Sequence, residues 1–372
     1  MQLRTLTEFK KLHELSSNTT LVIPEEEFFA SLEDIRNKIE SSTDKWTLIS
    51  HCEDQVSGFQ HLDQVQVLNQ LAEDLKDRVV IFIISVNKLV LSNLIHYYFF
   101  PEYHAIYWPL YKDMTPTYRL NDVTHKYLCL NKRGDPWRQV LYKKFWMDGL
   151  IDHSHFSYLC EDDNYGTLFH EPTWEANCKW ADEDFIPRFM PGLEGPWPEP
   201  KFRELPNDLL LDQYKTGTFD KDDDPTWTTD LTLSLTSFCT IVIETNISNK
   251  MINISEKTIR ALALGQPMIL LGKNGTHQYL KDLGFDMLDD IIDNSFDQEP
   301  KTYARFCKFV SSIDKINQHT TGALQHVKCS VRKRLESNRT RVEELHTKMN
   351  KRSKEIIKEV LDDFNKHMNI DQ

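Results

Sequence analysis

Short apolar runs alternate with segments of helical periodicity along the chain, most clearly in the stretch 240–297. Thr240–Glu244 and Met268–Leu271 are apolar and end at turn residues, which predicts two strands buried on both faces. Ser255 precedes a helical period that ends at Gly265, which predicts a helix with Ser255 as its N-cap. A second helix is expected after the second strand, so this stretch predicts a βαβα unit.

The first 123 residues show the same alternation. Strands are expected at Thr20–Ile23, Trp46–Ser50, Val79–Ser85 and Ile106–Trp108, and helices at Phe28–Ile39, Leu62–Leu75 and Leu89–Phe99. Strands that alternate with helices predict a mainly parallel sheet. A further strand at Thr124–Asn131, followed by a helix to about Asp148, begins a new unit, so we place a domain boundary near residue 123.

Residues 161–230 differ from the rest because they are rich in Asp, Glu, Pro and Trp and have no clear period. We expect an irregular insertion there, in which the Trp side chains anchor a loop rather than form platforms for sugars. Asp222–Asp224 contains a D-x-D pattern but lies beside no expected strand, so we expect no bound metal. The predicted domains are 1–123, 124–320 with this insertion, and a helical tail, 321–372.

The tail follows an amphipathic helix expected at Thr302–Ile316. It is charged and locally basic, with Arg332, Lys333, Arg334, Arg339 and Arg341. The simplest interpretation is the solvated face of a packed helix. The alternatives are a surface for a partner or for oligomerisation, and a site for an acidic polymer.

Composition limits the classes of function. The chain has 372 residues, and its 40% of hydrophobic residues indicates a globular protein. Its net charge of −13 argues against non-specific binding to nucleic acid. It contains no apolar run long enough to cross a membrane and no signal-peptide pattern at its N-terminus. The seven cysteines are scattered without a C-x-x-C pair, which is typical of reduced thiols, so we expect a cytoplasmic location, or the host cytoplasm for a viral chain.

Candidate chemistry gathers where the strand ending at Glu244 meets the helix that begins with Ser255, Glu256 and Lys257. Ligands of parallel sheets bind at the carboxyl ends of strands, beside helix N-termini whose free N–H groups suit phosphate. A carboxylate there can accept hydrogen bonds from sugar hydroxyls. A plain βαβα unit with a capping box and a solvated Glu–Lys pair explains the residues equally well.

A second cationic turn precedes the helix after Asn131. Arg133 and Arg138 flank this turn, and an Arg fork matches a pyrophosphate in bidentate geometry. A solvated basic turn is the alternative, with about equal weight.

The order of these features resembles the C-terminal half of GT-B glycosyltransferases, especially the fucosyltransferase-like and exostosin-like families. The matching residues are Glu244, Ser255-Glu256-Lys257, Ala261–Gly265, Pro267, Met268–Leu271 and Gly272. Gly275–Phe285 is also similar to bacterial and viral members. The fucosyltransferase pattern has Glu-Asn-Ser where this chain has Glu244-Thr245-Asn246, which leaves the identity of the sugar open. The resemblance covers roughly 60 residues, and the remainder of the chain only in layout.

The resemblance implies an α/β protein with two Rossmann-like domains that face each other across a cleft, and a long helical tail. It implies transfer of a hexose or pentose, without metal or cofactor, from a nucleoside-diphosphate sugar to a glycan or another hydroxyl acceptor. The expected donor-binding residues are Asn131, Arg133, Arg138, Glu244, Ser255, Glu256, Lys257 and Arg260. The catalytic candidates are Glu244 and, as general base from the N-terminal half, Asp54 or Glu26.

Two rival hypotheses remain at this stage. The first is a catalytically inactive protein of the same fold that binds partners through its helical tail. The second is a transferase that acts on a modified DNA base, which the basic tail permits and the acidic net charge disfavours.

Overall fold

The structure is a computed structural model, in which two units are distinguished: residues 1–103 with 249–251 and 347–372, and residues 104–248 with 252–346. The residues that it describes are 20–23, 37, 40–41, 46–50, 70, 73, 80–85, 95–98, 100–119, 123–131, 136–158, 231–244, 247 and 252–369. The insertion expected at 161–230, with Asp222–Asp224, lies outside them.

The first unit contains a four-stranded sheet in the order β1-β2-β3-β4, with every neighbouring pair parallel. Its strands are β1 (Thr20–Ile23), β2 (Trp46–Ser50), β3 (Val80–Ser85) and β4 (Ile95–Tyr98). The first three confirm the strands predicted from apolar runs, because a short β-branched run between polar residues suits a parallel strand.

The prediction for the fourth strand was wrong. β4 lies within Leu89–Phe99, where a helix was expected, and the segment expected as a strand instead forms η3 (Tyr103–Tyr107) and α5 (Trp108–Tyr111). Pro109 stands in the first turn of α5, where its fixed φ and missing N–H favour a helix start over a central strand.

The second unit contains another four-stranded parallel sheet, in the order β6-β5-β7-β8. Its strands are β5 (His125–Asn131), β6 (Ser154–Tyr158), β7 (Ser237–Ile243) and β8 (Met268–Leu271). The chain passes from β5 to its neighbour β6 on one side and later returns to place β7 on the other side. The sheet therefore has a topological switch point between β5 and β7.

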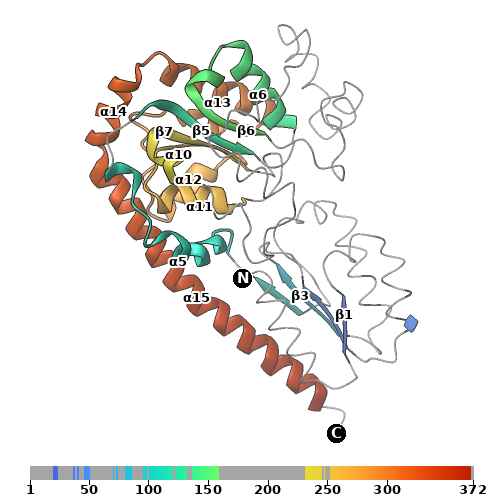
Figure 1. Ribbon diagram of the computed structural model, residues 1–372. Coiled ribbons are helices and arrows are strands. Elements are labelled where there is room, and N and C mark those ends of the chain that lie inside the picture. The colour runs from blue at the N-terminus through green and yellow to red at the C-terminus, as the bar shows by residue number, and fades with distance from the viewer. Residues whose placement is uncertain are drawn as a thin grey trace, which may run out of the picture. The chain divides into compact units, whose positions relative to one another are not determined.

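Helices cover both faces of this second sheet (Figure 1). One face carries α6 (Pro136–Met147) and α13 (Thr302–Asn317), and the other carries α11 (Glu256–Ala263) and α12 (Thr276–Asp282). The remaining elements are η4 (Thr117–Arg119), η5 (Ile151–His153), α10 (Leu231–Thr236), η8 (Ser295–Gln298), α14 (Thr321–Ser330) and α15 (Arg332–Asn369). The chain is thus an α/β protein with parallel sheets, as the alternating pattern predicted.

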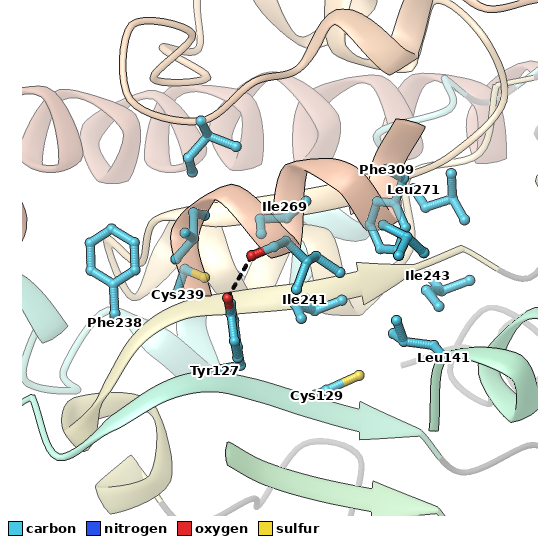
Figure 2. Packing of buried hydrophobic residues seen from close by; sticks show 14 of the residues in the cluster. Tyr127, Cys129, Leu141, Phe238, Cys239, Ile241, Ile243, Ile269, Leu271 and Phe309 are labelled. Carbon is cyan, nitrogen blue, oxygen red and sulfur yellow. Dashed lines mark hydrogen bonds between the residues drawn. The ribbon is translucent and has the colours of Figure 1, made fainter. Parts of the chain in front are cut away.

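The core of the second unit lies between the sheet and the helices α6 and α13 (Figure 2). Cys129, Cys239 and Ile241 point from β5 and β7 into it, and both thiols are fully buried. Burial raises the pKa of the Cys129 thiol to about 12, so this thiol stays protonated and packs as a small apolar group. The hydroxyl of Tyr127 crosses the layer and donates to the carbonyl oxygen of Ile313 in α13, at 2.9 Å.

The predicted charged tail consists of α14 and the 38-residue α15. Two of its arginines bind other parts of the second unit: Arg334 pairs with Asp286 and Asp290, and Arg341 donates to the carbonyl oxygen of Leu283. These two arginines therefore connect α15 to other segments of the second unit. No helix in the described ranges is both long and apolar enough to span a membrane.

Candidate functional site

The switch point of the second sheet brings the predicted residues of both βα units to one edge. Asn131 is the last residue of β5, and Glu244 directly follows β7, the neighbouring strand. Arg138, in the first turns of α6, donates from Nη2 to the carbonyl oxygen of Ile243 at 2.8 Å. The structure therefore places Asn131, Arg138 and Glu244 at the carboxyl edge where ligands of doubly wound sheets bind.

Glu244 is buried there, with 2% of its surface exposed. Its Oε1 atom accepts hydrogen bonds from the backbone N–H of Ser255 at 3.0 Å and from the hydroxyl of Thr258 at 2.5 Å. Its Oε2 atom has no hydrogen-bond partner in the described part of the chain. Burial raises the pKa of Glu244, and the hydrogen bonds from Thr258 and Ser255 and the charge of Lys257 oppose that rise.

Helix α11 begins as predicted, with Ser255 as N-cap. Ser255 has extended backbone angles, and its Oγ accepts a hydrogen bond from the N–H of Lys257 at 3.3 Å. The N–H of Ser255 itself binds Glu244. Two amides at this helix start therefore already bind protein oxygens.

Three charged side chains lie along the first turns of α11. Lys257 forms an ion pair with Glu256, and the Lys257 side chain is 29% exposed. Burial raises the pKa of Glu256, but the charges of Lys257 and His104 outweigh it and bring this pKa down to about 2. Burial lowers the pKa of Arg260, while Tyr111 and Glu256 act in the opposite direction. At neutral pH Glu256 is therefore an anion at this helix start.

The remaining predicted residues differ in how they are placed. Asn131 is buried and donates from Nδ2 to the sulfur of Cys129 at 3.2 Å, and Arg138 is 2% exposed. Arg133, Glu26 and Asp54 lie outside the described residues. The expected approach of Arg133 and of the general base to this edge stays a prediction.

Sequence reasoning missed Arg305, which connects segments of this edge. Its Nε donates to the carbonyl oxygen of Gly272 at 3.0 Å, its Nη2 donates to that of Ile247, and its Nη1 donates to that of Glu299 at 2.6 Å. It thereby holds a residue between β7 and α11 against the end of β8. No local signal could reveal the bonds to Gly272 and Ile247, because these partners lie in other segments.

Two side-chain contacts that organise the helix starts were missed as well. Asp297 accepts hydrogen bonds from the backbone N–H groups of His277 and Gln278, at 3.0 and 3.3 Å, and so caps α12 from a distant segment. Thr258 supplies the hydroxyl that binds Glu244. Its position three residues after the N-cap was a usable signal, since residues there face the helix start.

No group of three or more His, Cys, Asp or Glu side chains in the described ranges is arranged to hold a metal ion. Comparison of the chain with protein-family models, with curated proteins and with solved structures finds no match.

Proposed function

We propose that this protein is a GT-B-type glycosyltransferase, which moves a sugar from a nucleoside-diphosphate sugar to a hydroxyl acceptor. The observation that carries the proposal is the switch point between β5 and β7, where Arg138, Glu244 and the start of α11 lie at one carboxyl edge. Nucleotides bind at this place in doubly wound sheets.

The donor diphosphate is assigned to the start of α11. Lys257 provides a partly exposed ammonium there, and Arg260 follows on the next turn of the same helix. Cations fixed beside the leaving diphosphate stabilise the charge that develops as the sugar–oxygen bond breaks. Glu256, which is ionised at neutral pH, is assigned to accept hydrogen bonds from donor hydroxyls.

The division of the chain supports the GT-B assignment. Each of the two units contains a four-stranded parallel sheet, and residues 347–372 group with the N-terminal unit. The resemblance implies two Rossmann-like domains and a long helical tail. We assign the acceptor to the N-terminal unit and keep Glu26 and Asp54 as candidates for the general base.

A panel of nucleoside-diphosphate sugars tests the proposal, with thermal unfolding and release of the nucleotide as readouts. A donor at 100 times its Kd should stabilise the protein by about 2.7 kcal/mol. Lys257→Ala should abolish most turnover. It also leaves Glu256 without its ion pair, so thermal unfolding is measured to show that the variant stays folded. Lys333→Ala, at an exposed position of α15, is the matched control and should keep full activity. Turnover retained by Lys257→Ala would contradict the assignment.

A second candidate is a catalytically inactive binding protein with the same fold. Two occupied backbone amides favour it: the N–H of Ser255 binds Glu244, and the N–H of Lys257 binds the Ser255 hydroxyl. For such a protein the panel should give neither thermal stabilisation nor nucleotide release with any donor.

A further inference from the structure

The hydrogen bonds of the Glu244 side chain differ from those expected for a carboxylate that binds a ligand or transfers a proton. We infer that Glu244 is a positioning residue, which fixes the first turn of α11 so that Lys257 can bind the donor diphosphate. This inference rests on the proposed function of the site and explains how Lys257 is positioned there.

The backbone of Glu244 belongs to the sheet. Its N–H donates to the carbonyl oxygen of Leu271 at 2.9 Å, which continues the pairing of β7 with β8. Its side chain then reaches α11 and accepts two hydrogen bonds from Ser255 and Thr258. A single residue therefore connects the end of the sheet rigidly to the start of the helix.

The same contact determines where Lys257 lies. Ser255, whose N–H binds Glu244, accepts a hydrogen bond from the N–H of Lys257 through its own side chain. A carboxylate at a helix N-terminus also interacts favourably with the helix dipole. Glu244 is 2% exposed, whereas the Lys257 side chain is 29% exposed, so Lys257 is the member of this chain of contacts that can meet a ligand.

Only one oxygen of Glu244 takes part in these contacts. Oε1 accepts both hydrogen bonds, and Oε2 has no partner among the described residues. An amide oxygen can accept the same two hydrogen bonds, so a glutamine at this position should replace the glutamate without loss of function. A carboxylate that takes a proton, or that needs both oxygens for a ligand, has no such substitute.

Steady-state kinetics with Glu244→Gln, Glu244→Ala and Thr258→Val test the inference. Glu244→Gln should keep kcat and the donor KM within about twofold of wild type. Glu244→Ala should raise the donor KM about tenfold, and Thr258→Val about threefold. These factors correspond to about 1.4 and about 0.65 kcal/mol, the range expected for lost hydrogen bonds. In both variants, kcat should fall as well, since Lys257 stabilises the leaving diphosphate, so the rise in KM is the diagnostic readout. A merely structural role would reduce the amount of active protein, which lowers the apparent kcat and leaves KM unchanged.

A double-mutant cycle identifies the residue through which Glu244 acts. In a Lys257→Ala background, Glu244→Ala should weaken the binding of inorganic pyrophosphate no further, since the group that it positions is already gone. Thr258→Val serves in the same cycle if Glu244→Ala does not fold. Loss of turnover in Glu244→Gln, or additive effects in the cycle, would overturn the inference.

Pyrophosphate binding also separates the two proposals. If wild type binds pyrophosphate in a Glu244-dependent way but transfers no sugar, the transferase assignment fails and the positioning role stands. If a sugar is transferred and Glu244→Ala has the wild-type KM, the positioning role fails and the transferase stands. If wild type binds neither pyrophosphate nor any nucleotide sugar, both proposals fail.

Discussion

The guanidinium of Arg339 in α15 donates from Nη1 to the carbonyl oxygen of Ala263, the last residue of α11, at 2.6 Å. Its Nη2 donates at the same time to the carbonyl oxygens of Lys112 at 2.5 Å and Tyr111 at 3.1 Å. The charge also lies 5.0 Å from the ring centroid of Trp108. One side chain thus caps the C-terminal ends of two helices, α5 and α11, where a cation is favoured by the helix dipoles.

Arg339→Lys should destabilise the protein although it keeps the charge. A lysine ammonium lacks the planar fork that reaches several carbonyls at once, so at least one of these carbonyls loses a charge-assisted hydrogen bond. The expected loss is about 1.5–3 kcal/mol, measured by urea unfolding. Lys333→Ala, on an exposed position of the same helix, should stay within about 0.5 kcal/mol of wild type. Equal unfolding midpoints for Arg339→Lys and wild type would show that the fork is dispensable.

Gly265 should not tolerate a side chain. Its φ of +62° is unfavourable for other residues, and a Cβ atom there would lie 2.4 Å from Cδ1 of Tyr118, a buried ring. Gly265→Ala should therefore cost about 1–2 kcal/mol for the backbone angle and more for displacement of the ring.

Gly322 provides the matched control for this substitution. It lies in the first turn of α14, and a Cβ atom there would meet nothing within 4 Å. Gly322→Ala should raise stability by up to about 1 kcal/mol, because alanine is the better helix former. Thermal unfolding of both variants should thus show shifts of opposite sign, and a stabilised Gly265→Ala would contradict the argument.

The strands were predictable where burial alone determines them. β2 and β8 have the predicted bounds, and β7 begins three residues before the predicted start at Thr240. Ser255 was recognised as N-cap because capping depends on neighbours within one turn. The short segment of β4 could not be separated from a helix by its pattern, since four residues give too little periodicity.

Contacts between distant segments could not be predicted in the same way. Arg138 was recognised as a candidate, but its hydrogen bond reaches a carbonyl 105 residues away. Arg305 was not recognised, and its bonds to Gly272 and Ile247 span 33 and 58 residues. Such bonds depend on the order of strands in the sheet, which local propensity does not encode. The sequence therefore pointed to the edge of the site but not to the bonds that build it.

Lys328 in α14 is a buried cation whose removal should stabilise the protein. It is 2% exposed, and its ammonium donates to the carbonyl oxygen of Ser237 at 2.8 Å. Gln266 donates to the same oxygen at 3.0 Å, so this acceptor stays bonded when the lysine is replaced. Burial lowers the pKa of Lys328 to about 8, against an ordinary value of about 10.4.

The sign of the pH dependence follows from these two values. Below about pH 8 the folded and unfolded states both carry the proton, and the folded state bears the full cost of a buried charge. Between about pH 8 and 10.4 only the unfolded state binds the proton, so the stability contributed by this group rises with pH.

Lys328→Met, which is similar in length and apolar, should therefore raise the free energy of unfolding by about 1–3 kcal/mol at pH 7. That advantage over wild type should shrink as the pH approaches 10. Urea unfolding of both proteins at pH 7 and pH 9.5 measures it, with Lys333→Met as the exposed control that should show no such trend. A difference between Lys328→Met and wild type that is the same at both pH values would show that the buried amine is not the cause.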